Sequence, residues 1–175
     1  KGLERAIVLF KGLVERCIKM EWAGQFSLNF DDNEEDLKWA ALSGCRIVLI
    51  GIESEKSEQL KEAGKKLNLH MGVDAYAIVY KKIHRYGINV LGDFIFGLDS
   101  DTKQSLYDRA GYILKSGIDA WQTTILTPLP GTGLYNRLKA ENRIVHTDYP
   151  DDWSRYDFSE PVIVPKNMST QELAL

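Results

Sequence analysis

The stretch INVLGDFIFG, residues 88–97, decides the fold of this chain, and it continues directly into LDSDT, residues 98–102. Its apolar residues form a nearly continuous run, which is typical of a parallel strand that is covered on both faces. The residues that follow predict a tight turn and the start of a helix. Asp93 is the single charge within the run, and a carboxylate inside an α/β core is unfavourable unless something holds it. Asp93 is therefore either hydrogen-bonded by its own scaffold or available to a ligand.

The composition is that of a soluble globular domain. The chain has 175 residues, of which 44% are hydrophobic and 27% are charged, so it can bury a full core. The net charge of −3 offers no attraction to nucleic acids or anionic membranes, and we expect neither as a partner. No apolar run is long enough to span a bilayer, and no signal peptide is recognisable. Cys17 and Cys45 lack the spacing of a metal site, so we expect two buried thiols, no metal centre and a reducing, cytoplasmic location.

Helical and strand patterns alternate along the chain. Strands are predicted at residues 22–30, 46–52, 88–97 and 120–127, with helices around them at residues 2–20, 34–42, 57–64, 72–86, 102–114 and 133–140. This alternation implies parallel strands, right-handed crossovers and outer helices, so the fold class is α/β, as a barrel or a sheet. Beyond residue 148 the pattern lapses, and we expect an aromatic-rich tail that lies across the strands. The chain starts inside a helical pattern, so we expect it to be a piece of a longer protein.

Polar residues share one parity on the predicted strands, and this is the main functional signal. In parallel α/β folds the ligand lies at the carboxyl ends of the strands. The polar positions expected on one common face are Gln25, Ser27, Asn29, Gly51, Glu53, Asp93, Gly97, Gln122 and Thr124. Barrel interiors are usually filled by branched apolar side chains, so this set predicts a polar ligand or a water-filled cleft.

Structural explanations compete with the functional ones for several of these residues. Asp93 could accept hydrogen bonds from backbone amides, and Glu53 with Ser54 could cap the next helix. The turn LTPLPGT, residues 126–132, could be only rigid, although its backbone would make a flat shelf for a planar ring. The basic run at residues 61–66 reads as a solvated helix end. No phosphate loop, metal-spaced cluster or nucleophile elbow is present, so chemistry here would need an absent cofactor or an absent part of the chain.

Four stretches together resemble the radical S-adenosylmethionine (radical SAM) superfamily: WAGQFSLNF, SGCRIVLIGIESEKSEQLKEAGKKLN, GINVLGDFIFGLDSDT and TILTPLPGTGLY. The chain is most similar to the group that often carries an N-terminal cobalamin-binding domain. The resemblance implies a partial, TIM-like (β/α)6 barrel, of which this chain holds about four parallel strands with outer helices. It implies an enzyme that cleaves S-adenosylmethionine (SAM) reductively to a 5′-deoxyadenosyl radical at a 4Fe-4S cluster. Residues 1–142 would be the C-terminal part of the barrel, and residues 143–175 an extension packed on it.

The resemblance also implies roles for individual residues. Glu53 and Ser54 match the end of a strand that faces the polar groups of SAM. Asp93, Ile95 and Gly97 match the strand that faces its ribose and adenine. The remaining assignments place Gln122, Leu126 and Pro128 on the cofactor side, and Gln25, Ser27, Asn29 and Thr124 on the substrate side.

The sequence lacks the CxxxCxxC motif that holds the cluster, which the resemblance places upstream of this chain. We therefore expect SAM and the cluster, with or without cobalamin, in the parent protein, and no radical chemistry from this chain alone. The substrate would be a small molecule that the sequence does not identify. Open strand edges at residues 22–30 and 120–127 predict self-association of the isolated chain. Two alternatives stay open: a different βα-barrel enzyme that uses Glu53 and Asp93 as acid and base, or a non-catalytic binding domain.

Overall fold

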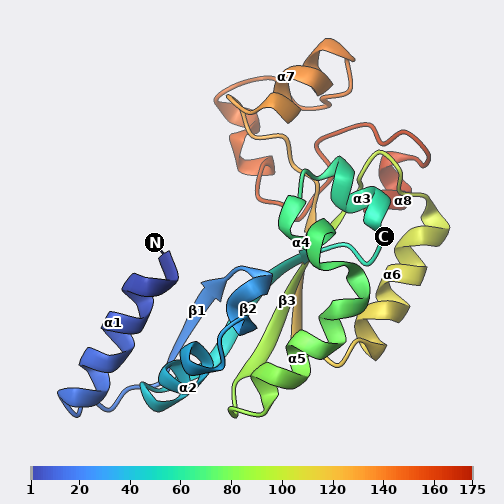
Figure 1. Ribbon diagram of the computed structural model, residues 1–175. Coiled ribbons are helices and arrows are strands. Elements are labelled where there is room, and N and C mark those ends of the chain that lie inside the picture. Colours follow the sequence, from blue (N-terminus) through green and yellow to red (C-terminus); the bar gives the residue numbers. More distant parts are fainter. Residues whose placement is uncertain (1, 175) are drawn as a thin grey trace.

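The computed structural model describes residues 2–174 as an α/β fold built on one four-stranded parallel sheet (Figure 1). The strands follow the chain order in space: β1 (Trp22–Phe26), β2 (Cys45–Glu53), β3 (Asn89–Phe96) and β4 (Ala120–Ile125). The α-helices are α1 (Gly2–Glu15), α2 (Glu34–Leu42), α3 (Ser57–Glu62), α4 (Lys66–Met71), α5 (Tyr76–His84), α6 (Lys103–Lys115), α7 (Gly133–Ala140) and α8 (Thr170–Leu173). Three 3-10 helices complete the fold: η1 (Leu28–Asp31), η2 (Val73–Ala75) and η3 (Asp151–Arg155). The predicted α/β class is confirmed.

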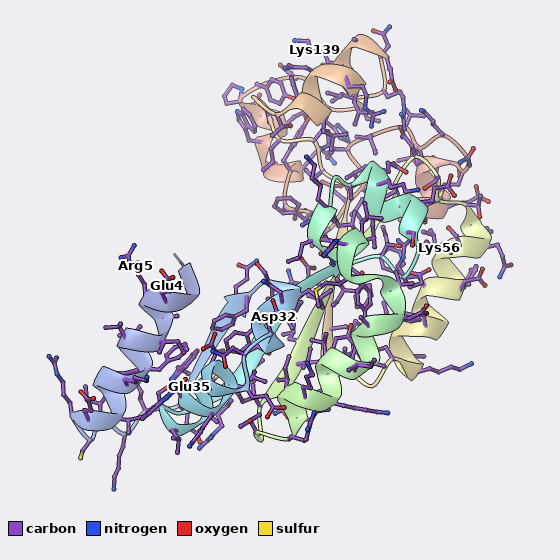
Figure 2. All side chains as sticks on the ribbon, viewed as in Figure 1. Glu4, Arg5, Asp32, Glu35, Lys56 and Lys139 are labelled. Atoms are coloured by element: carbon purple, nitrogen blue, oxygen red, sulfur yellow. The ribbon has the colours of Figure 1, made fainter. Side chains whose placement is uncertain are left out.

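Helices cover one face of the sheet, and the hydrophobic core lies between these helices and the sheet. Val48, Val90 and Phe94 point from the central strands into this core, where Tyr80 and Ile83 of α5 are also fully buried. At the N-terminal end α1 packs against α2, and Figure 2 shows Glu35 of α2 on the side facing α1, where it pairs with Lys11 at 3.2 Å. None of the helices within residues 2–174 is long and apolar enough to cross a membrane.

The face of the sheet opposite the helices is called the open face. Because of this face, the expectation that β3 is covered on both sides is wrong. On β3 the side chains of Leu91, Asp93 and Ile95 alternate with buried ones and are only half-buried. The register aligns Gly51, Asp93 and Gln122 across three neighbouring strands. The near-continuous apolar run arises because the half-buried Leu91 and Ile95 lie on this face beside the polar residues.

Two local elements differ from the sequence prediction. The first strand ends at Phe26 rather than at residue 30, and η1 follows it. Leu28 and Phe30 keep their apolar alternation because they are buried in this turn, where the rings of Phe26 and Phe30 stack at 4.0 Å. Residues 66–71, which lie between two predicted helices and outside both, form α4. Cys17 is exposed, contrary to expectation, because it lies after the end of α1, whereas Cys45 is buried.

The C-terminal segment, residues 143–174, contacts the carboxyl end of the sheet. The backbone N–H of Ile125 donates to the carbonyl of Phe158 at 2.8 Å, and the Asn167 side chain donates to the Asp99 carbonyl at 2.8 Å. The Asp99 carboxylate also pairs with Arg143 at 2.7 Å and Lys166 at 3.1 Å. Figure 2 shows Lys139 of α7 on this side of the molecule, far from Glu4 of α1.

Candidate functional site

A cavity of about 600 Å³ lies on the open face at the carboxyl ends of the strands. It is lined by residues from all four strands, the α3–α4 connection and the C-terminal segment: Gln25, Glu53, Lys65, Asp93, Ile95, Gln122, Thr124, Ile125, Leu126, Thr127 and Phe158. A second hollow of about 290 Å³ adjoins it on the β1 side and shares Gln25, Glu53, Lys65 and Asp93 with it. The shared parity of polar residues on the strands therefore predicted side chains that do line one cavity.

Most of the predicted site residues lie at this cavity. Those in its lining are Gln25, Glu53, Asp93, Ile95, Gln122, Thr124 and Leu126. Ser27 lines the second hollow, beside Gly51. The strand register explains the convergence, because Asp93 pairs with Gln122 and Ile95 with Thr124 on adjacent strands.

Four predicted residues lie elsewhere. Ser54 is fully buried, and its hydroxyl accepts the backbone N–H of Lys56 at 2.9 Å and donates to Gln59. Gly97 has φ +92°, and a Cβ there would come within 2.8 Å of Leu173 of α8. Asn29 lies in η1 rather than on a strand, and Pro128 is buried outside the cavity lining. The expectation that Ser54 caps the next helix is wrong, because the N-cap of α3 is Lys56, which within residues 2–174 has no side-chain cap hydrogen bond; Ser54 instead holds the turn before the helix.

An ion pair between Glu53 and Lys65 lies over Gly51 at the junction of the two hollows. The sheet register shifts between Gly51 and Glu53, and Glu53 adopts a left-handed φ of 66°. A Cβ on Gly51 would lie 2.7 Å from the Glu53 Oε1 atom and 3.9 Å from the Lys65 Nζ atom. The absent side chain at Gly51 therefore makes room for both charges. Sequence reasoning missed Lys65, because a lysine within a basic helical connection carries no signal of a partner on a distant strand.

Asp93 has an unsatisfied carboxylate oxygen in this cavity. Its Oδ1 atom is buried and has no hydrogen-bond partner among residues 2–174. Burial raises the pKa of the Asp93 carboxyl, the Glu53 carboxylate raises it further, and the charge of Lys65 opposes both effects. Buried polar atoms in folded proteins almost always have partners, and this oxygen has none among the described residues, so it can still accept a hydrogen bond. The two carboxylates and the ammonium group can bind hydroxyl or amine groups and can exchange a proton.

A buried polar network fixes the strand ends behind this site, and sequence reasoning did not find it. Arg109 of α6, which is fully buried, donates to Asp101 at 2.9 Å and to Glu55 at 3.0 Å. The Asp101 carboxylate also accepts the backbone N–H groups of Gly97 and Leu98, both at 3.0 Å. Gln59 of α3 donates to the same carboxylate at 2.6 Å. The network ties the turn after β3 to α3 and α6, and so holds Asp93 and Glu53 on fixed strands.

The described residues do not provide a metal centre. Within residues 2–174 no group of three or more His, Cys, Asp or Glu side chains could hold a metal ion. The two cysteines lie apart, one exposed after α1 and the other buried at the start of β2. Because an iron–sulfur cluster is held by several cysteine thiolates, the residues present do not fit one.

No model of a protein family matches the chain, but individual relatives do. It is 31% identical over 166 residues to the bacteriochlorophyllide d C-12(1)-methyltransferase of Chlorobaculum tepidum, covering 94% of this chain and 34% of that protein. It is 28% identical over 171 residues to an uncharacterised methyltransferase of Pyrococcus horikoshii, covering 98% of this chain and 35% of the relative. The chain spans about a third of the length of these curated relatives.

Among solved structures, the radical SAM methyltransferase TsrM of Kitasatospora setae, determined with cobalamin and a 4Fe-4S cluster, superposes with a TM-score of 0.65. The match has 16% sequence identity and covers 77% of this chain and 26% of TsrM. The chain has the fold of a radical SAM barrel. The resemblance predicted from the sequence is thereby confirmed, including the partial barrel. The cavity on the open face lies at the carboxyl ends of the four strands.

Proposed function

We propose that this chain is the C-terminal part of the barrel of a radical SAM enzyme, and that the cavity on the open face holds part of SAM. The relatives named as methyltransferases and the radical SAM fold support an enzyme of this type. The observation that carries the proposal is the buried, unpartnered Oδ1 atom of Asp93, because a hydroxyl group of a bound ligand would satisfy it.

The residues of the cavity fit the chemistry of SAM. Asp93 and Gln122 would accept or donate hydrogen bonds to the ribose, and Glu53 would attract the cationic end of SAM. Ile95 and Leu126 would contact the adenine ring. Gln25, Ser27 and Thr124 remain on the substrate side. SAM supplies the radical or methyl chemistry when it is bound, and these side chains bind and orient it.

The 4Fe-4S cluster belongs to another part of the parent protein in this proposal, since the cysteines of this chain do not fit it. This chain alone is therefore proposed to be inactive. Methyl transfer is suggested by the relatives that are named methyltransferases, and cobalamin by TsrM, while the small-molecule substrate stays unidentified. We place the protein in the cytoplasm, with neither nucleic acid nor membrane as a partner.

The test is anaerobic expression of the full-length reading frame that contains this chain. After reconstitution with iron and sulfide, we expect an iron–sulfur absorption band and 5′-deoxyadenosine or S-adenosylhomocysteine on reduction with SAM. The isolated chain, treated identically, should give neither product. A full-length protein without iron and without SAM-derived products would overturn the proposal, and turnover by the isolated chain would overturn its inactivity.

One observation favours a second candidate, an acid–base enzyme that uses no radical. Glu53 and Asp93 line the same cavity, and burial together with the Glu53 charge raises the pKa of Asp93. A carboxyl with a raised pKa beside an ionised one is the arrangement expected for a general acid and a general base. This candidate predicts turnover without reductant or SAM, abolished in both Glu53→Gln and Asp93→Asn.

A further inference from the structure

The C-terminal segment contributes one large aromatic side chain to the cavity, that of Phe158. This residue lines the cavity of about 600 Å³ and also a hollow of about 360 Å³ that includes Phe96, Thr123 and Leu173. Phe158 is 41% exposed at this position between the two hollows. A phenylalanine this exposed at a cavity wall keeps apolar surface that a ligand could cover.

The backbone holds Phe158 in place at some conformational cost. Phe158 has a left-handed φ of 69°, which is unfavourable for a residue with a bulky side chain. Its carbonyl accepts the N–H of Ile125 at the end of β4, at 2.8 Å. The Asp157 carboxylate accepts the N–H of Ser159 at 2.9 Å, which fixes the other side of the turn. Strain that is maintained next to a cavity is characteristic of functional positions.

Other aromatic residues of the same segment already have partners. Trp153 stacks on Tyr149 with ring centroids 4.6 Å apart, and the Tyr156 hydroxyl donates to the His146 carbonyl at 2.6 Å. Phe158 has no aromatic partner among residues 2–174 within ring-contact distance. Among residues 143–174, Phe158 is therefore the aromatic residue that lines the cavity without an aromatic partner.

The cavity beside Phe158 is apolar on one side and polar on the other. Ile95, Ile125 and Leu126 lie with Phe158 in its lining, and Asp93 and Gln122 provide the polar groups. An aromatic ring binds a flat heterocycle by stacking, while polar groups at the edge fix its orientation.

We propose that Phe158 is a cofactor-binding residue on which the adenine ring of SAM stacks, so that the C-terminal segment completes the cofactor site of the barrel. This inference rests on the proposed function, because it assumes that the flat ring in the cavity belongs to SAM. It assigns a cofactor contact to a segment outside the barrel strands, and it explains why strained backbone is kept at this position.

The test measures binding of S-adenosylhomocysteine to the full-length protein by isothermal titration. Phe158→Ala removes the ring and keeps the unfavourable φ, whereas Phe158→Gly removes both the ring and the strain. Both variants should bind roughly tenfold more weakly or worse, the range expected for losing a base–aromatic stack. Phe158→Trp should retain affinity. The matched control is Tyr107→Ala, which removes an aromatic side chain that is 61% exposed on α6, and it should bind as the wild type does.

The outcomes separate the two proposals. If wild-type protein binds S-adenosylhomocysteine and both Phe158→Ala and Phe158→Gly bind equally well, the stacking inference is wrong and the proposed function stands. If those variants keep this affinity but lose turnover, the ring contacts the substrate rather than adenine, and the inference is again wrong. If the wild-type protein does not bind S-adenosylhomocysteine at all, both the proposed SAM site and the stacking inference are wrong.

Discussion

At the scale of single residues, Asp93 lowers the stability of the fold, a cost that its proposed role in binding a ligand would explain. Its pKa is raised chiefly by burial, so the ionised form is disfavoured in the folded protein. Asp93→Asn should therefore raise the melting temperature at neutral pH, by roughly a few degrees. The gain should shrink as the pH falls from the raised pKa of the folded state to the ordinary pKa of the unfolded state. Below that value the carboxyl is protonated in both states, and the difference should vanish.

The measurement is the melting temperature of both proteins between neutral and acidic pH. Asp74→Asn is the matched control, because it neutralises an exposed carboxylate on η2 and should give no comparable pH-dependent gain. A loss of stability in Asp93→Asn at neutral pH would mean that the scaffold stabilises the charged form of Asp93.

At the scale of elements, the buried Arg109 network should decide whether the strand ends are held together. Arg109→Met keeps roughly the same volume and removes the charge, and it leaves the buried Asp101 carboxylate without its cationic partner. Breaking a buried pair in this way typically costs about 3–5 kcal/mol of unfolding free energy. Urea unfolding would measure this loss, and adding Asp101→Asn should recover part of it.

The control for that variant lies on the same helix. Lys103→Met removes a cation whose pair with Glu172, at 3.5 Å, is exposed to solvent on both sides. Exposed pairs contribute little, so this variant should unfold close to the wild type. Equal losses for Lys103→Met and Arg109→Met would show that burial of the Arg109 pair is not the cause.

The elements also show how far the sequence could predict this molecule. Strand parity placed Asp93, Gln122 and Thr124 on the correct face, because their strands are regular throughout. The same rule failed for Asn29, where the chain turns into η1 while Leu28 and Phe30 keep an alternating pattern. Contacts between distant segments carry no periodic signal. Lys65 meets Glu53, and Phe158 meets Ile125, only because the fold brings separate loops to the ends of β2 and β4.

At the scale of the whole molecule, the two outer strands of the sheet are not equally exposed to pairing. At the end of β4, the N–H of Ile125 already donates to the carbonyl of Phe158, so the C-terminal segment covers part of that edge. β1 is the other outer strand, and within residues 2–174 it pairs only with β2. Unpaired edges of this kind invite association with another chain.

We therefore predict that the isolated chain self-associates through the β1 edge, with an average mass in light scattering that rises with concentration. Ala23→Lys places a charge on the exposed side of β1 and should shift the chain toward monomer, because edge lysines oppose strand pairing. Ala77→Lys adds the same charge at an exposed position of α5 and should leave association unchanged. A monomer at every concentration, or equal effects of the two lysines, would contradict pairing at β1. In the proposed parent protein this edge would pair with further barrel strands. The average mass of a full-length protein should therefore not rise with concentration in the same way.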